Sequence, residues 1–198
     1  IHCDNFFNVP TDCFVSPANS WGFLDGGIDN AIRKYYNDKN IDVQKTVNYK
    51  LENHHNGELL VGEVMYVDLH YIFDLTDIPN LIVAPTMRVP MKLPKETVNI
   101  YLAMRGILLQ LRNINKNSYN TKVIKSISIS GLGTGIGKVP FDICAKQMKQ
   151  AYDDFWLGEY KFPKTWKEAQ DRHQLLYGDT VRDIQYEELD DGLISKNL

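Results

Sequence analysis

The sequence predicts an α/β protein in which helices cover both faces of a largely parallel sheet. Three observations favour this class. Segments with strand character alternate with segments of helical periodicity along most of the chain. The run NLIVAP (80–85) is apolar throughout, as expected for a strand buried on both faces. Two glycine-bearing turns lead from a strand into a helix, which is typical of such sheets.

The first half of the chain supplies three predicted strands and one helix. DCFVSP (12–17) is a short apolar run that ends in proline, and it predicts the first strand. GGIDNAIRKYYN (26–37) carries apolar side chains at helical spacing and predicts a helix. The β-rich run 58–69 is broken by Gly62 and predicts a second strand, and 80–85 predicts the third. ENHHNGE, around 54–55, predicts a polar turn.

The second half continues the alternation. Residues 94–112 begin with a proline and carry one apolar helical face, so they predict a helix. VIKSISIS (123–130) predicts the next strand. Residues 139–156 predict a helix in which Pro140 occupies the first turn, where proline is tolerated.

The C-terminal part differs in character. Residues 163–178 predict an amphipathic helix that packs on the domain or on a partner, and its stripe consists of Trp166, Ala169, His173 and Leu176. His173 is expected to be a partly buried packing residue rather than a ligand. Residues 179–198 are acidic and weakly patterned, which is compatible with a frayed end or an added strand.

Composition excludes several classes of function. A chain of 198 residues is expected to form one domain. Its net charge of −3 does not favour general nucleic-acid binding, and no apolar run is long enough for a membrane span.

Three cysteines without a CxxC pattern indicate reduced thiols and a cytoplasmic location. The histidines lack metal-ligand spacing, so we expect no metal and no cofactor. The chain begins with Ile1 rather than Met, which fits processing or one domain of a longer protein.

The stretch GLGTGIGKVP (131–140) is a candidate anion-binding loop. Bare backbone at the end of a strand lets main-chain N–H groups approach a phosphate. The P-loop template fails because Val139 follows Gly137-Lys138, and the dinucleotide fingerprint G-x-G-x-x-G also fails. A strand-to-helix turn without a ligand is the alternative.

A second loop of the same kind is SPANSWGFLDGGIDNAI (16–32), which also passes through glycines into a helix. In an open α/β sheet, ligands bind where loops leave the carboxyl ends of the strands. Two such helix starts would present two sets of N–H donors, each with the positive end of a helix dipole. The pair predicts a site for a diphosphate that is held by backbone rather than by lysines.

In four places the sequence resembles the macro domain family, whose members bind ADP-ribose. VSPAN (15–19) is similar to the family's V-N-A-A-N, and GGID (26–29) to the glycine run and Val-Asp of the hydrolytic, MacroD-like members. IPNLIVAP (78–85) is similar to the family strand that reads roughly LPxxYVIHxVGP. GLGTGIGKVP (131–140) is similar, without gaps, to G-I-S-T-G-I-Y-G-F-P.

The resemblance implies a three-layer α/β/α fold with a mixed, largely parallel central sheet. It implies a macro domain over 1–160, followed by a C-terminal helical extension over 161–198 that packs on the same domain. The implied ligand is ADP-ribose, or an ADP-ribosylated substrate, bound by a monomer. The implied activity is hydrolysis of ADP-ribosyl linkages. A non-catalytic reader or sponge of such nucleotides and an ADP-ribose 1″-phosphate phosphatase are the alternatives.

The resemblance also assigns residues to roles. Asn19 would bind a hydroxyl of the distal ribose, and Asp29 would assist water attack at that sugar. Asp4 would accept from the adenine amino group. The ligand-binding residues implied are Asp4, Asn5, Ala18, Gly26, Gly27, Ile28, Gly131, Gly133, Thr134, Gly135, Ile136 and Gly137. An aspartate that only complements the helix dipole is the alternative for Asp29, and a plain turn aspartate is the alternative for Asp4.

Several positions depart from the family pattern. Ser16 and Pro17 replace an Asn and an Ala of V-N-A-A-N, and Leu24-Asp25 replace two glycines of the glycine run. Gly137 and Val139 replace the Tyr and the Phe of G-I-Y-G-F-P, so the aromatic residue that usually covers the distal ribose is missing from that loop. Trp21 is a candidate substitute from the first loop. These departures favour the reader, whereas Asp29 with Asn19 favours the hydrolase.

Overall fold

The computed structural model describes residues 4–70, 77–117 and 123–184. Its sheet has four strands in the order β2-β3-β1-β4, namely β1 (Cys13–Ser16), β2 (Met65–Asp68), β3 (Asn80–Val83) and β4 (Ile127–Ser128). The central strand β1 pairs in parallel with both β3 and β4, and only β2 runs antiparallel to its neighbour. The sheet is therefore mixed and largely parallel, as the sequence predicts.

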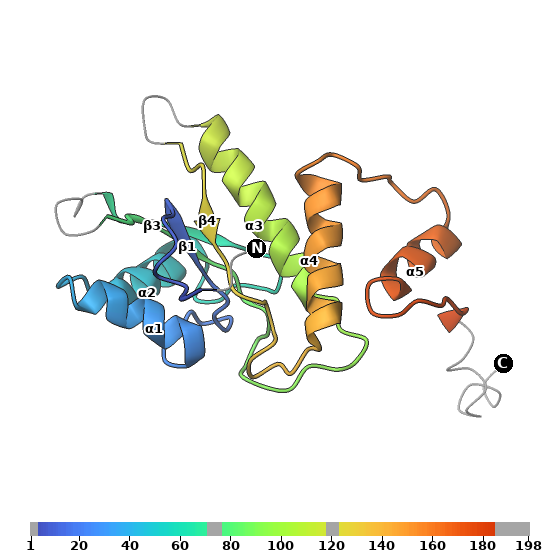
Figure 1. Ribbon diagram of the computed structural model, residues 1–198, viewed down its shortest axis with the longest axis horizontal. Coiled ribbons are helices and arrows are strands. Elements are labelled where there is room, and N and C mark those ends of the chain that lie inside the picture. Colours follow the sequence, from blue (N-terminus) through green and yellow to red (C-terminus); the bar gives the residue numbers. More distant parts are fainter. Residues whose placement is uncertain (1–3, 71–76, 118–122, 185–198) are drawn as a thin grey trace.

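Helices cover both faces of this sheet (Figure 1). All four residues of β1 and of β3 are buried, because consecutive side chains enter two separate cores. Phe14 and Leu81 face the core formed with α1 (Gly27–Asn37) and α2 (Val43–His54). Val15 and Ile82 face the core formed with α3 (Asn99–Lys116) and α4 (Phe141–Phe155). The fold is the predicted three-layer α/β/α arrangement.

Helix α2 was not predicted, and the interpretation of ENHHNGE (52–58) as a polar turn is wrong for its first three residues, which belong to this helix. His54 is the last residue of α2, and His55 caps the helix end. The helix begins after Asp42, whose carboxylate accepts from the N–H of Lys45 at 3.1 Å. The apolar side chains that α2 buries are Val43, Val47 and Leu51, which form a narrow stripe, so the helical periodicity in the sequence is weak.

The predicted elements of the second half have other bounds in the structure. Helix α3 begins at Asn99, five residues after Pro94, and ends at Lys116, beyond the predicted end at 112. Helix α4 and strand β4 are shorter than the predicted 139–156 and 123–130. The N–H of Leu93 donates to the carbonyl of Gly137 at 2.9 Å, which joins the loop before α3 to the glycine-rich loop. The two loops lie next to each other at the bottom of Figure 1.

The C-terminal helix α5 (Trp166–Gln174) lies beyond α4 in Figure 1. Thr165 caps it by accepting from the N–H of Glu168 at 3.1 Å. The predicted apolar stripe is only partly correct: Leu176 is buried, but Trp166 and His173 are exposed.

Two glutamines occupy the buried positions of α5 instead. Gln170 and Gln174 are buried because their amides bind the backbone of the segment that follows the helix, at Arg182 and Ile184. Residues 185–198, most of the predicted frayed end or added strand, lie outside the described residues. Among the described residues, no helix combines the length and the apolar character that a membrane crossing requires.

Candidate functional site

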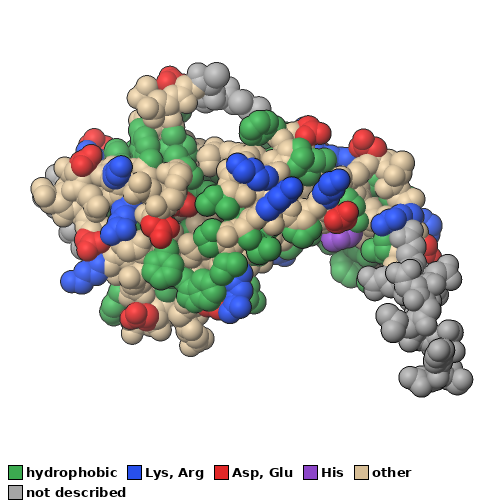
Figure 2. Space-filling model, turned by 90° about the horizontal axis from the view of Figure 1, so that it is seen from below, with side chains coloured by type: hydrophobic (Ala, Val, Ile, Leu, Met, Phe, Trp, Pro, Cys, Tyr) green, Lys and Arg blue, Asp and Glu red, His purple; other side chains and the backbone are tan. Residues whose placement is uncertain are grey.

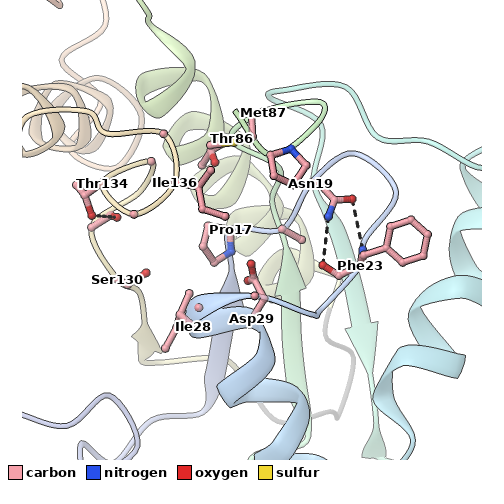
Figure 3. Close-up of a pocket in the computed structure, with 18 of the residues that line it drawn as sticks. Pro17, Asn19, Phe23, Ile28, Asp29, Thr86, Met87, Ser130, Thr134 and Ile136 are labelled. Atoms are coloured by element: carbon pink, nitrogen blue, oxygen red, sulfur yellow. Dashed lines mark hydrogen bonds between the residues drawn. The ribbon is translucent and has the colours of Figure 1, made fainter. Parts of the chain in front are cut away.

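A cleft of about 280 Å³ opens at the carboxyl edge of the sheet. Its walls come from the loops that follow β1, β3 and β4, together with the first turn of α1. Every site residue predicted from the sequence lines this cleft, except Asp4 and Asn5. Figure 3 shows Asn19, Ile28 and Asp29 on one side, with Thr134 and Ile136 on the loop opposite. The two glycine-bearing loops, 16–32 and 131–140, lie far apart in the chain but share one site.

The start of α1 forms the first phosphate-binding candidate. Gly26 occupies the N-cap position with an extended backbone, and no side chain caps the helix. Gly27 has a φ of +52°, in the left-handed region that favours glycine. The first N–H groups of a helix have no partner inside it, and the helix dipole makes them attractive to an anion. The first residues of α1 line the cleft, and no side chain caps their N–H groups. This helix start is therefore open to the cleft.

The loop 131–137 forms the second candidate. The N–H of Val139 closes the loop on the carbonyl of Gly133 at 3.1 Å. Loop hydrogen bonds use the N–H groups of Thr134, Lys138 and Val139, while those of Gly135 and Ile136 have no protein acceptor among the described residues. These two N–H groups are therefore available to a ligand. The hydroxyl of Thr134, one of the predicted ligand-binding residues, donates to the carbonyl of Gly131 at 2.8 Å.

This loop departs from the family pattern at two neighbouring positions. Lys138 stands where G-I-Y-G-F-P has its second glycine, and its φ of +55° is in the region that favours glycine. Gly137 stands where that pattern has tyrosine. A Cβ at Gly137 would lie 2.5 Å from the carbonyl oxygen of Gly133, so this backbone admits no side chain there. The loop keeps the turn of the pattern but cannot carry its aromatic residue.

Asp29 lies in the first turn of α1 and lines the cleft. The hydroxyl of Ser16, a fully buried residue at the end of β1, donates to Asp29 Oδ1 at 2.5 Å. Burial raises the pKa of Asp29 to about 6, the Ser16 hydrogen bond lowers it, and the nearby carboxylate of Asp25 raises it. Asp29 is therefore mainly ionised at neutral pH but close to its titration range, which is the condition that a general base needs.

Asn19 also lines the cleft, but its amide is engaged by its own loop. Its Oδ1 accepts from the N–H groups of Trp21 and Phe23, and its Nδ2 donates to the carbonyl of Phe23 at 3.2 Å (Figure 3). An isolated bridge to Met87 ties the same residue to the loop after β3. Asn19 thus shapes the wall of the cleft, and binding a ribose hydroxyl would require it to share or exchange these hydrogen bonds.

The aromatic residue at the cleft is Phe23 and not Trp21. Phe23 is 52% exposed and lines the cleft, whereas Trp21 does not line it. The Trp21 ring is held on the outside by the guanidinium of Arg88, 5.0 Å from its centroid. Arg88 is itself fixed by a two-contact ion pair with Glu58. The family pattern gave no indication of Phe23, which follows the V-N-A-A-N-like stretch.

Asp4 and Asn5 are not brought to the cleft. The Asp4 carboxylate accepts from the N–H of Asn5 and from the side chain of Asn8, and Asn5 accepts from the N–H of Phe7. These contacts form a local turn at the start of the described chain, and neither residue lines the site. The predicted interaction of Asp4 with adenine stays a prediction.

The described residues also contain no group of three or more His, Cys, Asp and Glu that could hold a metal ion. Cys13 and Cys144 are free thiols and both are buried. The face of the molecule in Figure 2 carries hydrophobic side chains among charges of both signs. Phe23, Ile136 and Phe141 are among the exposed hydrophobic residues.

Known structures share this fold. The macrodomain of Mycobacterium tuberculosis DarG matches with a TM-score of 0.59 and 18% identity, over 77% of this chain and 88% of that one. An Oceanobacillus iheyensis macrodomain with ADP matches with a TM-score of 0.57 and 22% identity, over 84% and 80%. Thermosipho africanus DarTG in complex with ADP-ribose matches with a TM-score of 0.51 and 20% identity, over 81% of this chain and 38% of that one.

At these identities the structural likeness shows the fold alone. No curated protein matches the chain. The model of one protein family, described as a macro-like domain, matches residues 5–177 and therefore runs through α5. Since that match covers most of the sequence, the chain belongs to the macro-like domain family.

Proposed function

We propose that the cleft binds ADP-ribose, or a closely related nucleotide, and hydrolyses ADP-ribosyl linkages. The observation that carries this proposal is that the start of α1 and the loop 131–137 line one cleft, together with Asp29. Similar folds in other organisms support the ligand class, since one is a macrodomain with ADP and another is a complex with ADP-ribose.

The pyrophosphate is expected to lie between the two glycine-bearing loops. Among the described residues that line the cleft, none is lysine or arginine. The counter-charge therefore comes from backbone N–H groups and from the positive end of the α1 dipole. Gly26 and Gly135 suit this role, because a Cβ built on either would meet no atom within 4 Å, which leaves the space beside their backbone open.

The distal ribose is expected to lie near Asp29. The carboxylate would accept a proton from water as the oxygen of that water attacks C1″ of the ribose. The bond from C1″ to the attached group then breaks with its electron pair on the leaving group. That group takes up the proton that Asp29 had accepted, so free ADP-ribose and the protonated leaving group result and the carboxylate is restored. A carboxylate at this point also stabilises positive charge that develops on the sugar.

The two alternatives differ in how well the cleft suits them. A non-catalytic reader is favoured by Asn19, whose amide is bound to its own loop, and by the glycine at position 137. A 1″-phosphate phosphatase is disfavoured, because Asp25 and Asp29 both line the cleft and would repel a further phosphate near the distal ribose. The reader is thus the second candidate.

Titration calorimetry tests the ligand. We expect ADP-ribose to bind with a dissociation constant in the micromolar range, roughly −8 kcal/mol, and AMP to bind much more weakly. Gly135→Ala should weaken binding at least tenfold without lowering the melting temperature, because its Cβ meets no protein atom and its backbone is not in the left-handed region. Absence of heat with ADP-ribose in the wild-type protein would reject the ligand assignment.

Turnover separates enzyme from reader. An ADP-ribosylated protein is incubated with the wild-type protein, with Asp29→Ala and with Asp142→Ala. Asp142 is the matched control, since it is an acidic residue in the first turn of α4 but does not line the cleft. We expect release of ADP-ribose by the wild type and by the control, and a loss of at least a hundredfold in Asp29→Ala. Equal rates in all three proteins would remove Asp29 from the mechanism, and no release by any of them would favour the reader.

A further inference from the structure

Ser16 occupies a position that connects the sheet to the site. It is the last residue of the central strand β1 and is fully buried. Its carbonyl accepts from the N–H of Ala84 at 2.9 Å. Its side-chain hydroxyl donates to Asp29 Oδ1 at 2.5 Å. A hydrogen bond from a hydroxyl to a carboxylate at this length belongs to the strong, charge-assisted class.

The contact leaves one carboxylate oxygen for chemistry. Ser16 occupies Oδ1, and among the described residues no protein donor reaches Oδ2 of Asp29. The side chain of Asp29 projects from the start of α1 toward the space between the two loops (Figure 3). A carboxylate held through one oxygen can use the other to accept from water, and its direction is fixed by a rigid strand rather than by a loop.

We propose that Ser16 is a positioning residue for the proposed hydrolysis, and that its hydroxyl holds the carboxylate of Asp29 ionised and aimed into the cleft. This inference rests on the proposed function, because it concerns the same site. Ser16 touches Asp29 and not the expected position of the ligand, since it does not line the cleft.

The surroundings of Asp29 favour the protonated form of its carboxyl group, so a group that favours the ionised form is needed. Asp25 and Asp29 are the only titratable side chains among the described residues that line the cleft. Burial and the negative charge of Asp25 both raise the pKa of Asp29, and the Ser16 hydrogen bond is the one contribution that lowers it. A base that accepts a proton from water must be ionised before it acts, so Ser16 opposes the two effects that would disable it.

The first test measures Asp29 directly in the ligand-free protein. A carbon-13 NMR titration of its carboxyl group is recorded in the wild type, in Ser16→Ala and in Ser126→Ala. We expect Asp29 to titrate at clearly higher pH in Ser16→Ala. Ser126→Ala is the matched control: it removes a hydroxyl that donates to Asp12 Oδ2 at 3.0 Å, far from the cleft, and should leave Asp29 unchanged. Titration of Asp29 at the same pH in all three proteins overturns the proposal.

A second variant covers the case in which Ser16→Ala does not fold. Ser16→Cys keeps nearly the same shape and replaces the hydroxyl by a weak thiol donor. It should shift the titration of Asp29 in the same direction by a smaller amount. An unchanged titration in Ser16→Cys, together with an unchanged melting temperature, also overturns the proposal.

The pH dependence of turnover gives the functional readout. Loss of rate in Ser16→Ala should be several-fold greater at about pH 6 than at about pH 8, because the acid limb of the profile moves to higher pH. A loss that is the same at every pH indicates a packing defect and overturns the proposal. Failure of the proposed function is read from different data: the wild type would then release no ADP-ribose at any pH, while the NMR titration would still decide whether Ser16 keeps Asp29 ionised.

Discussion

Among single residues, Asp29 is the one whose proposed role in the site lowers the stability of the folded protein. Its pKa in the folded protein is about 6, above the value of 3.8 expected without the fold, chiefly because of burial. The folded state therefore holds this proton more tightly than the unfolded state. The contribution of Asp29 to the free energy of unfolding is greatest below about pH 4 and is lost as the pH rises through about 6. At neutral pH the ionised carboxylate destabilises the protein, by at most about 3 kcal/mol.

Replacing this carboxylate should therefore stabilise the protein while it removes the activity. We expect Asp29→Asn to have a higher melting temperature than the wild type at about pH 8, and the difference to disappear at about pH 4. Differential scanning calorimetry at several pH values measures it. If Asp29→Asn were less stable than the wild type at about pH 8, the carboxylate would be a structural residue, such as a dipole-complementing aspartate.

Asp12 provides a control, because its pKa is shifted in the opposite direction from that of Asp29. Burial raises the pKa of Asp12, but hydrogen bonds from the N–H groups of Lys125 and Ser126 and from the Ser126 hydroxyl outweigh it, so the pKa is lowered. This carboxylate stabilises the fold above its unfolded pKa, and its contribution is lost as the pH falls through the folded pKa. Asp12→Asn should accordingly lower the melting temperature at about pH 8.

At the scale of elements, the sequence predicts best those segments whose pattern is local. The α1 helix, the strands β1 and β3 and the glycine-bearing loops could be predicted, because apolar runs, helical spacing and glycines act over a few residues. Helix α2 could not, because it buries few apolar side chains and depends on packing against α1 and the sheet. The buried amides of α5 could not either, because glutamine is usually exposed and these two are buried by contacts made after the helix ends.

The candidate site divides in the same way. Its backbone elements follow from motifs, and twelve predicted residues do line the cleft. The contact between Ser16 and Asp29 joins residues 13 apart through a hydrogen bond, and no local pattern indicates it. Phe23 lines the cleft, whereas Trp21 contacts Arg88, which comes from a different loop, and no local pattern indicates that contact. What the sequence missed is therefore the set of side-chain contacts between elements.

Helix α2 has a direct connection to the site through Gln44. This buried amide accepts from the N–H of Leu24 at 2.8 Å and donates to the carbonyl of Gly22 at 2.9 Å. It thus clamps the backbone on both sides of Phe23. Gln44→Ala leaves these two buried backbone groups without partners, and we expect it to cost roughly 1–3 kcal/mol and to weaken ADP-ribose binding.

Chemical denaturation and calorimetry measure the two effects of Gln44→Ala. The matched control is Asn48→Ala, which removes the side-chain acceptor of Gln44 at 2.8 Å but leaves both contacts to the loop in place. Weakened binding in Gln44→Ala, with near-normal binding in Asn48→Ala, is the expected result. Unchanged binding in Gln44→Ala would mean that the loop around Phe23 does not need this clamp to receive the ligand.

At the scale of the whole molecule, the two cores place the site. One core holds α1 and α2 against the sheet and the other holds α3 and α4, so the loops that leave β1, β3 and β4 all emerge at one edge. The cleft is lined by the loop that leads from β1 into α1 and by the loop that leads from β4 into α4, and these two helices pack in different cores. Backbone donors held in this way need little reorganisation to receive an anion.

The extension that begins at residue 161 contains α5, which contacts α4 through Arg172. We propose that it is part of the same folding unit, because it supplies a partner to a buried carboxylate. Asp154 on α4 is buried and accepts from the Tyr101 hydroxyl at 2.7 Å and from Gln150 at 3.0 Å. Arg172 on α5 completes the set, and its guanidinium also lies 4.6 Å from the centroid of the Tyr160 ring.

Removing Arg172 should therefore destabilise the domain and not only the extension. Arg172→Ala leaves the Asp154 carboxylate buried with only neutral donors, which we expect to cost on the order of 3 kcal/mol. The control is Lys149→Ala on α4, which breaks an exposed ion pair with Asp153 and should leave the melting temperature nearly unchanged. Scanning calorimetry of both variants should show one transition, lowered clearly in Arg172→Ala alone. Two separate transitions, or an unchanged main transition with faster proteolysis near residue 162, would mean that the extension is only tethered to the domain.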